Sequence, residues 1–152
     1  MPNIAADVVI IGAARTAIGS YGGALKDQSA CDLATLVVKE AFVRAGVEPK
    51  RAGQIVLGNV LHTEARDMYV SPVAGLQAGM PNESAALTLN RLCGSGLQAI
   101  VTAANAIQLG DCDVAVGGGG PDERAEVPRH DVVAPDPVIE VVDDVEEARA
   151  VA

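Results

Sequence analysis

Four short apolar runs alternate with three segments of helical character along the first 120 residues, and this alternation limits the fold more than any other feature. The runs lie at residues 8–11, 55–57 (continuing toward residue 61), 85–89 and 114–116. Apolar side chains on both faces are what a buried parallel strand needs. The resulting order, βαβαβαβ, predicts an α/β fold with a mostly parallel sheet and right-handed crossovers.

The three predicted helices have recognisable boundaries. Ser29 precedes the first helix, which should end near residue 45, before Gly46. Ser71 and Pro72 open the second helix, which should run to about residue 79. The third should begin after Cys93 and end at the glycine at position 110. Its expected apolar face consists of Leu97, Ile100, Val101, Ala104 and Ile107.

The composition changes at residue 121. Asp, Glu, Pro, Val and Ala dominate residues 121–152 without a clear period, and three prolines interrupt any long element. Residues 138–142 can form a short strand and residues 143–152 a frayed acidic helix, but the segment as a whole has the composition of a disordered chain. The sequence therefore predicts a domain over residues 1–120 and an irregular acidic tail over residues 121–152.

The charge and the cysteines exclude several classes of function. The formal net charge of −9 argues against nucleic acid or an anionic membrane as a partner. No apolar stretch reaches the ~18 residues of a membrane span, and no basic segment followed by a long apolar run marks a signal peptide. The three cysteines include no close pair, so no disulfide framework is expected. These features favour a reducing, cytoplasmic compartment.

Cys93 is the main candidate for chemistry. It stands at the expected junction of a strand and a helix, with Gly94 and Gly96 in the first helical turn. The first N–H groups of a helix lack internal partners, and the helix dipole favours negative charge, hence a thiolate, beside them. Each glycine costs about 1 kcal/mol relative to alanine but lets a bulky substrate approach the backbone. The segment predicts a cysteine nucleophile beside an oxyanion-binding site.

Other residues have weaker patterns. Residues 94–99 match the dinucleotide-binding pattern G-x-G-x-x-A, but the acidic residue expected after the following strand is missing. Cys112 lies between two aspartates that should raise its pKa, and we expect it to be structural. Cys31 lies near a helix start without a cationic partner in the sequence, so no chemistry is expected there.

The two histidines do not suggest a metal site. His62 and His130 have no regularly spaced Cys, His or carboxylate residues around them. His130 lies in the acidic tail and should be solvated, whereas His62 follows the second strand and should have a packing role. Close to His62, the side chains of Arg66, Asp67 and Met68 are candidates for shaping an acyl pocket or a subunit contact.

A string of ordered motifs runs from about residue 8 to residue 119. Residues 90–100 read Asn-Arg-Leu-Cys-Gly-Ser-Gly-Leu-Gln-Ala-Ile and resemble the nucleophile segment of the thiolases, the acetyl-CoA acyltransferases. Residues 15–25, 58–60 and 113–119 are similar to further segments of that family. Residues 63–69 are similar to the β-ketothiolases that supply polyhydroxyalkanoate synthesis.

The resemblance implies a thiolase-like N-terminal half in which Cys93 takes an acyl group as a thioester. Acyl-CoA is then the substrate, and no resident cofactor is implied. A second acyl-CoA loses an α-proton and attacks the thioester, or the reverse reaction cleaves a 3-ketoacyl-CoA, as in fatty acid metabolism. Family members are commonly dimers or tetramers, so a complete fold would be expected to form a homo-oligomer.

The family's acid–base segments have no counterpart in this sequence. The family carries Cys-x-Gly, Gly-His-Pro and Asn-Glu-Ala-Phe segments in its C-terminal half, and neither Cys112 nor His130 stands in such a context. The family pattern stops after Gly119, as a frameshift, a truncated gene or a fusion boundary would produce. The resemblance therefore implies an incomplete fold, with Cys93 acylated and turnover deficient. Two alternatives stay open: a non-catalytic fragment that is inert or associates with a complete thiolase subunit, and a nucleotide-binding module.

Overall fold

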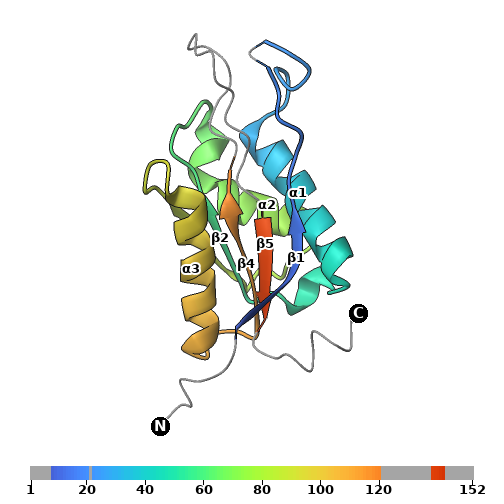
Figure 1. Cartoon of the computed structure of the whole chain (residues 1–152), viewed down its shortest axis with the longest axis vertical. Helices are drawn as coiled ribbons and strands as arrows, with labels where there is room; N and C mark the ends of the chain where they lie inside the picture. Colours follow the sequence, from blue (N-terminus) through green and yellow to red (C-terminus); the bar gives the residue numbers. More distant parts are fainter. Residues whose placement is uncertain (1–7, 21, 121–137, 143–152) are drawn as a thin grey trace.

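The computed structural model describes residues 8–20, 22–120 and 138–142. Figure 1 shows a twisted sheet with helices on both of its faces. The strands are β1 (Val9–Ala14), β2 (Gln54–Gly58), β3 (Ala85–Leu89), β4 (Val114–Gly119) and β5 (Val138–Val142). The helices are α1 (Ala30–Ala45), α2 (Val70–Ala78) and α3 (Ser95–Gln108), with the short 3-10 helices η1 (Pro49–Arg51) and η2 (Ala65–Tyr69).

The strands form a five-stranded sheet in the order β1-β5-β4-β2-β3. Strand β2 pairs in parallel with both β3 and β4, whereas β5 pairs antiparallel with β1 and β4. Four strands therefore run in the same direction and β5 runs against them. The expected α/β class and mostly parallel sheet are confirmed.

The two faces of the sheet carry different helices. Helices α1 and α2 pack on one face with Ile55 and Leu57 of β2, and α3 packs on the other face with Val56 of β2 and Ala115 of β4 (Figure 1). Successive residues of β2 thus point to opposite faces, as a strand requires. Val56, Leu57 and Ala115 have no exposed surface, so β2 and β4 are buried on both sides, as predicted. The same prediction is wrong for β1 and β3, in which Ile10 is 57% and Leu87 is 43% exposed, because these two strands are the edges of the described sheet.

Helices α1 and α3 lie close to their predicted positions. The Oγ atom of Ser29 accepts a hydrogen bond from the backbone N–H of Asp32 at 3.0 Å and caps α1, and Gly46 ends this helix with a φ of 67°. Helix α3 begins at Ser95 rather than at residue 94, and Gly110 follows its end with a φ of 80°. Positive φ favours glycine, so both glycines act as the predicted stops.

Helix α2 begins differently from the prediction. It starts at Val70, directly after η2, and Ser71 is not its cap. Instead, the Oγ atom of Ser71 accepts from the backbone N–H of Leu57 at 3.0 Å and donates to the carbonyl oxygen of Leu87 at 2.8 Å. The hydroxyl group therefore ties α2 to β2 and β3, which a reading of local sequence cannot reveal.

The apolar face predicted for α3 is only partly the face that meets the sheet. The buried hydrophobic residues of α3 are Ala99, Ala103, Ala106 and Ile107, whereas Leu97 and Val101 are 65% and 45% exposed. The reason is the short distance between α3 and β4. A Cβ atom on Gly117 would lie 2.8 Å from the Cα atom of Ile100, so only small side chains fit between them.

Strand β5 comes from the segment after residue 120 and lies between β1 and β4. Its residues, 138–142, are those in which the sequence allowed a short strand, so the irregularity expected after residue 120 does not extend to them. Residues 121–137 and 143–152 lie outside the described residues, and the boundary at residue 120 stays a prediction. Across the described ranges, no helix combines the length and apolar character that crossing a bilayer would need.

The burial of β2 predicts a large difference between two valine-to-alanine substitutions. Val56 has no exposed surface, whereas Val43 on α1 is 74% exposed. Val56→Ala should lower the free energy of unfolding by about 2–3 kcal/mol, since it leaves a cavity between β2 and α3. Val43→Ala should change it by less than about 0.5 kcal/mol. Urea denaturation of both variants measures the difference, and equal losses would contradict this packing.

Candidate active site

The carboxyl ends of β2, β3 and β4 meet at one edge of the sheet. The backbone N–H of Asn59 donates to the carbonyl oxygen of Leu89 at 2.9 Å, and that of Gly120 donates to Gly58 at 2.6 Å. These bonds continue the parallel pairing past the ends of the strands. Ligands of open α/β sheets bind outside this edge, and Cys93 follows β3 at this point.

Residues 90–95, called here the Cys93 turn, connect β3 to α3. Leu92 has a φ of 50°, the one left-handed backbone among the non-glycine residues that the structure describes. This conformation costs on the order of 1–2 kcal/mol for a leucine. The sharp reversal leaves Cys93 exposed, just before Gly94 at the N-cap of α3. Such a strained turn between strand and helix presents a side chain at the top of a sheet, as in the nucleophile turn of α/β-hydrolases.

The first N–H groups around the start of α3 are partly used within the turn itself. The N–H of Gly94 donates to the carbonyl oxygen of Arg91 at 3.2 Å, and that of Ser95 donates to Leu92 at 3.0 Å. These two N–H groups therefore do not form the oxyanion-binding site expected from the sequence, because each is already hydrogen-bonded to a carbonyl oxygen of the same turn. The positive end of the α3 dipole still lies beside Cys93, since that residue directly precedes the N-cap.

A second positive charge lies near the same place. A Cβ atom built on Gly94 would be 3.8 Å from the Nη1 atom of Arg91 and would meet nothing closer than 3.5 Å. The guanidinium of Arg91 is thus beside the start of α3. A negatively charged group near Cys93 would be favoured by both the guanidinium and the helix dipole.

The end of β2 lies directly under the start of α3. A Cβ atom on Gly58 would lie 2.6 Å from the Cβ atom of Ser95 and 2.8 Å from its carbonyl carbon. Real Cβ atoms do not approach so closely, so any other residue at position 58 would displace the first turn of α3. The glycine at the end of β2 therefore sets the position of the Cys93 turn above the sheet.

Asp67, one of the residues considered for a pocket, is structural. Its side chain has no exposed surface, and its Oδ2 atom accepts from the N–H and the hydroxyl of Thr63 at 2.8 and 2.9 Å and from the N–H of Glu64 at 3.0 Å. The amide of Asn59 donates to the carbonyl oxygen of Asp67 at 2.9 Å. These bonds fold the segment before α2 against the end of β2. Met68 remains 51% exposed and is still available for a contact.

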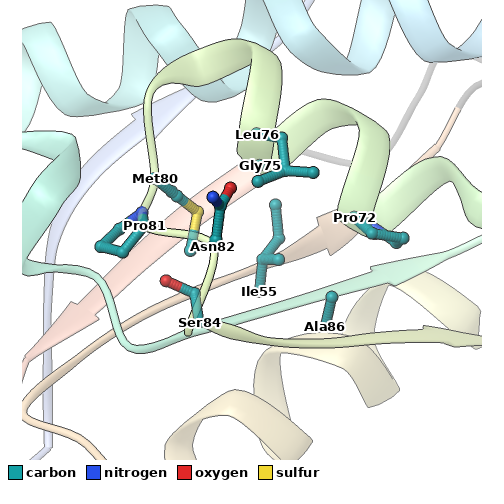
Figure 2. A pocket seen from close by; sticks show the side chains of 9 residues that line it. All are labelled: Ile55, Pro72, Gly75, Leu76, Met80, Pro81, Asn82, Ser84 and Ala86. Atoms are coloured by element: carbon teal, nitrogen blue, oxygen red, sulfur yellow. The ribbon is translucent and has the colours of Figure 1, made fainter.

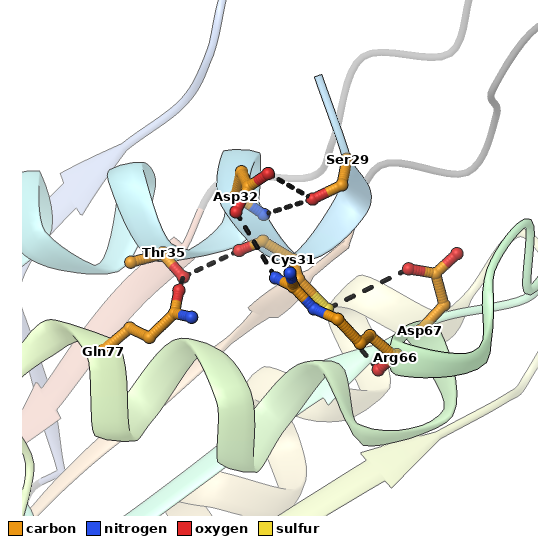
Figure 3. Close-up of polar contacts among 7 residues, drawn as sticks. All are labelled: Ser29, Cys31, Asp32, Thr35, Arg66, Asp67 and Gln77. Atoms are coloured by element: carbon orange, nitrogen blue, oxygen red, sulfur yellow. Dashed lines mark hydrogen bonds and ion pairs between the residues drawn. The ribbon is translucent and has the colours of Figure 1, made fainter. Parts of the chain in front are cut away.

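Arg66 and Cys31 lie in a neighbouring group of polar contacts (Figure 3). The guanidinium of Arg66 is 3.4 Å from the carboxylate of Asp32, which also accepts a 2.6 Å hydrogen bond from the hydroxyl of Ser29. The thiol of Cys31 is fully buried and donates to the carbonyl oxygen of Arg66 at 3.5 Å. Burial, and then the charge of Asp67, raise the pKa of the Cys31 thiol. The expectation that Cys31 has no cationic partner is wrong, because Arg66 lies beside it and acts to lower this pKa, but the net direction is upward. A raised pKa disfavours the reactive thiolate.

The remaining candidates separate clearly from Cys93. Cys112 is half-buried, and burial, followed by the charges of Asp111 and Asp113, raises the pKa of its thiol. The predicted direction is correct, although burial is the larger cause.

His62 is exposed, so the packing role expected for it is wrong within the described chain. His130 lies outside the described residues, and in the described part no group of His, Cys, Asp and Glu could hold a metal ion.

Figure 2 shows a pocket between α2 and the β3 edge, and no residue of the Cys93 turn lines it. It is lined by Ile55, Pro72, Gly75, Leu76, Met80, Pro81, Asn82, Ser84 and Ala86. Its volume of about 70 Å³ is well below the roughly 300 Å³ at which small-molecule sites begin. This pocket therefore does not serve as an acyl-CoA site, and the exposed Cys93 turn remains the candidate.

Comparison with known proteins places this geometry in one family. The sequence model of the thiolase N-terminal domain matches residues 8–133. The β-ketothiolase BktB of Cupriavidus necator is 55% identical over 113 residues, and the human mitochondrial 3-ketoacyl-CoA thiolase is 40% identical over 112 residues. Each match covers 74% of this chain, but only 29% and 28% of the two relatives.

Solved structures agree with the sequence relatives. The human mitochondrial 3-ketoacyl-CoA thiolase in complex with CoA superposes with a TM-score of 0.75 and 33% identity, over 84% of this chain and 34% of that one. The Acat5 thiolase of Ascaris suum in complex with coenzyme A gives a TM-score of 0.72 and 30% identity, over 86% of this chain and 36% of that one.

The sheet, the strained turn and these matches define an α/β domain of the thiolase fold. The chain belongs to the thiolase family and corresponds to its N-terminal domain. It spans about three tenths of the length of the curated relatives that it matches.

Exposure predicts the order in which the three cysteines react. Cys93 is exposed, Cys112 is half-buried and Cys31 is buried. Iodoacetamide should therefore alkylate Cys93 first, and Cys31 only after unfolding, since the buried thiols are both less accessible and less ionised. Peptide mass spectrometry at increasing reaction times gives the order. Modification of Cys112 before Cys93 would contradict the exposed turn.

Asp32 predicts a pH-dependent contribution to stability. The hydroxyl of Ser29, followed by the charge of Arg66, lowers the pKa of Asp32 below its ordinary value of about 3.8. A lowered pKa in the folded state stabilises the protein above the unfolded-state value, and this contribution fades as the pH falls through the folded-state value. The difference in urea midpoint between the wild-type chain and Asp32→Asn should thus shrink below about pH 4. A difference that stays the same from about pH 6 to about pH 2 would contradict this contribution.

Proposed function

We propose that Cys93 accepts an acyl group from acyl-CoA and that the chain supplies the acyl-acceptor part of a thiolase acyltransferase. The exposed position of Cys93 at the strained turn before α3 is the observation that carries this proposal. A cysteine that is exposed at the end of a strand and directly before a helix is accessible to a thioester, and a cysteine sulfur is the atom that attacks such a carbonyl.

The acyl-transfer step balances without any further reactant. The Cys93 thiolate attacks the thioester carbonyl of acyl-CoA, a bond forms between its Sγ atom and the acyl carbon, and the bond from that carbon to the CoA sulfur breaks. CoA leaves as a thiolate and takes a proton from water. The guanidinium of Arg91 beside Gly94 supports the approach of an anionic CoA derivative.

The names of the relatives indicate the substrate class. The relatives are named β-ketothiolase, acetyl-CoA acetyltransferase and 3-ketoacyl-CoA thiolase, and two of the similar structures contain CoA. Acyl-CoA and 3-ketoacyl-CoA thioesters of fatty acid metabolism are therefore the proposed substrates. The unpaired cysteines support a reducing, cytoplasmic location for this activity.

Acylation and sustained turnover are separate parts of this proposal. Condensation needs a base for the α-proton of the second acyl-CoA. The Gly-His-Pro and Cys-x-Gly segments that carry this chemistry in the family do not occur among the 152 residues. The 152-residue chain should therefore be acylated once at Cys93 and should not thiolyse acetoacetyl-CoA repeatedly.

A second candidate function is association with a complete thiolase subunit or with a second copy of the chain. It is supported by exposed large apolar side chains on and beside α3, namely Leu92, Leu97, Val101 and Leu109. Exposed large apolar side chains that gather on one element are a common feature of protein contacts. Co-purification of the tagged chain with a complete thiolase would support this function, and a monodisperse monomer in the presence of that thiolase would contradict it.

The acyl-acceptor proposal predicts a single covalent adduct. Incubation with acetyl-CoA should add the mass of one acetyl group to the wild-type chain, at the peptide that contains Cys93. Cys93→Ser should abolish this thioester, whereas Cys112→Ser should retain it because Cys112 is half-buried and less ionised. Intact-protein and peptide mass spectrometry measure both results. An adduct that persists in Cys93→Ser would reject Cys93 as the acceptor.

A further inference from the structure

The strained backbone of Leu92 is held by two side chains, in addition to the bond of 3.0 Å from the backbone N–H of Ser95 to its carbonyl oxygen. The Oδ1 atom of Asn90 accepts from the N–H of Leu92 at 2.9 Å, and the hydroxyl of Ser95 donates to the carbonyl oxygen of Leu92 at 2.6 Å. The same hydroxyl accepts from the N–H of Arg91 at 2.8 Å. A non-glycine residue stays in the left-handed region only where its surroundings over-determine it, and these bonds fix the polar groups on both sides of Leu92.

Both side chains also connect the turn to the end of β2. The Nδ2 atom of Asn90 donates to the carbonyl oxygen of Val60 at 3.3 Å. Ser95 is 5% exposed and lies against Gly58, where even a Cβ atom would be too close. The position of the Cys93 turn is therefore set by the sheet as well as by α3, through two residues that flank the cysteine.

We propose that Asn90 and Ser95 are positioning residues that keep Leu92 left-handed and so direct the Sγ atom of Cys93 toward an acyl donor. They act through the backbone of Leu92 and touch no reacting atom. Without either side chain, Leu92 would relax toward the ordinary backbone regions and turn Cys93 away from the start of α3. This inference rests on the proposed acyl transfer to Cys93.

Ser71 provides a matched control for the loss of Ser95. Its hydroxyl is also buried, accepts from one backbone N–H and donates to one carbonyl oxygen, and it accepts one further hydrogen bond from the hydroxyl of Thr88 at 3.1 Å, but it joins α2 to β2 and β3. Ser95→Ala and Ser71→Ala should therefore lower the urea midpoint of the full 152-residue chain by similar amounts. Only Ser95→Ala should slow the reaction of Cys93.

The readouts are the rate of alkylation of Cys93 by iodoacetamide and its rate of acylation by acetyl-CoA, each followed against pH. Ser95→Ala should lower the acylation rate about tenfold, and Asn90→Ala about fivefold, which are the effects of losing hydrogen bonds that hold a reactive geometry. Ser71→Ala and Asn105→Ala, the latter on an exposed residue of α3, should leave both rates unchanged. Equal acylation and alkylation rates in Ser95→Ala and Ser71→Ala would overturn the proposal.

A second substitution at Leu92 tests the strain itself. Glycine adopts a φ of 50° without the cost that leucine meets, and the Leu92 side chain is 68% exposed, so its removal leaves little empty space. When Leu92→Gly is added to Ser95→Ala, this double variant should therefore regain most of the acylation rate that Ser95→Ala loses. A double variant as slow as Ser95→Ala would show that the left-handed backbone is not what Ser95 maintains.

The two reagents separate this inference from the proposed function. Alkylation by iodoacetamide depends on the presentation and ionisation of Cys93 but needs no acyl-CoA recognition. If the wild-type chain is alkylated at Cys93 but never acylated, the acyl-acceptor function is wrong. The positioning role can then still be decided from alkylation alone. The comparison needs the alkylation rates of Ser95→Ala, of the double variant with Leu92→Gly, and of the Ser71→Ala control.

Discussion

The short distance between α3 and the sheet is the constraint on which the candidate site depends. Two glycines make it possible: at Gly58 and Gly117, a Cβ atom would lie 2.6 and 2.8 Å from atoms of Ser95 and Ile100. One lies under the start of the helix and the other under its second turn, so the helix axis has little freedom to shift. The position of Cys93 above the sheet follows from this contact, because Cys93 comes directly before the helix.

Much of this fold can be predicted from local sequence, because buried strands and helix ends leave local signals. The four apolar runs became β1 to β4, and Ser29 and Gly46 bound α1 as their residue types suggest. What could not be predicted depends on contacts between distant residues. Ser71 was expected to open α2, yet its hydroxyl bonds to β2 and β3. The alanine face of α3 is buried in place of some of its larger residues because glycines in β4 draw the helix close.

The candidate site also combines features that local sequence predicts with features that depend on contacts between residues. Cys93 stands out in the sequence through its neighbours, whereas Asn90 and Ser95 are not among the site residues predicted from the sequence. A signal for them does exist: an asparagine often accepts from the N–H two residues later, and a serine bonds to a carbonyl three residues before it. What the sequence does not reveal is that Leu92, between them, is left-handed. Two of the N–H groups expected to bind an oxyanion, those of Gly94 and Ser95, are used inside the turn, which only the hydrogen-bond geometry shows.

The position of β5 has a consequence for how the chain reaches its final form. In the described sheet, β1 pairs with β5, and β5 joins it to β4, although about 120 residues of sequence separate β1 from β5. During synthesis from the N-terminus, β1 is made before any other described strand, and its partner β5 is made after all of them. Contacts between residues so far apart close slowly, and unpaired edges are the places where growing chains aggregate. The rest of the sheet, in which β2 pairs with β3 and β4 over shorter separations, can form earlier. The edge of β1 that faces β5 therefore stays unpaired until β5 has been made.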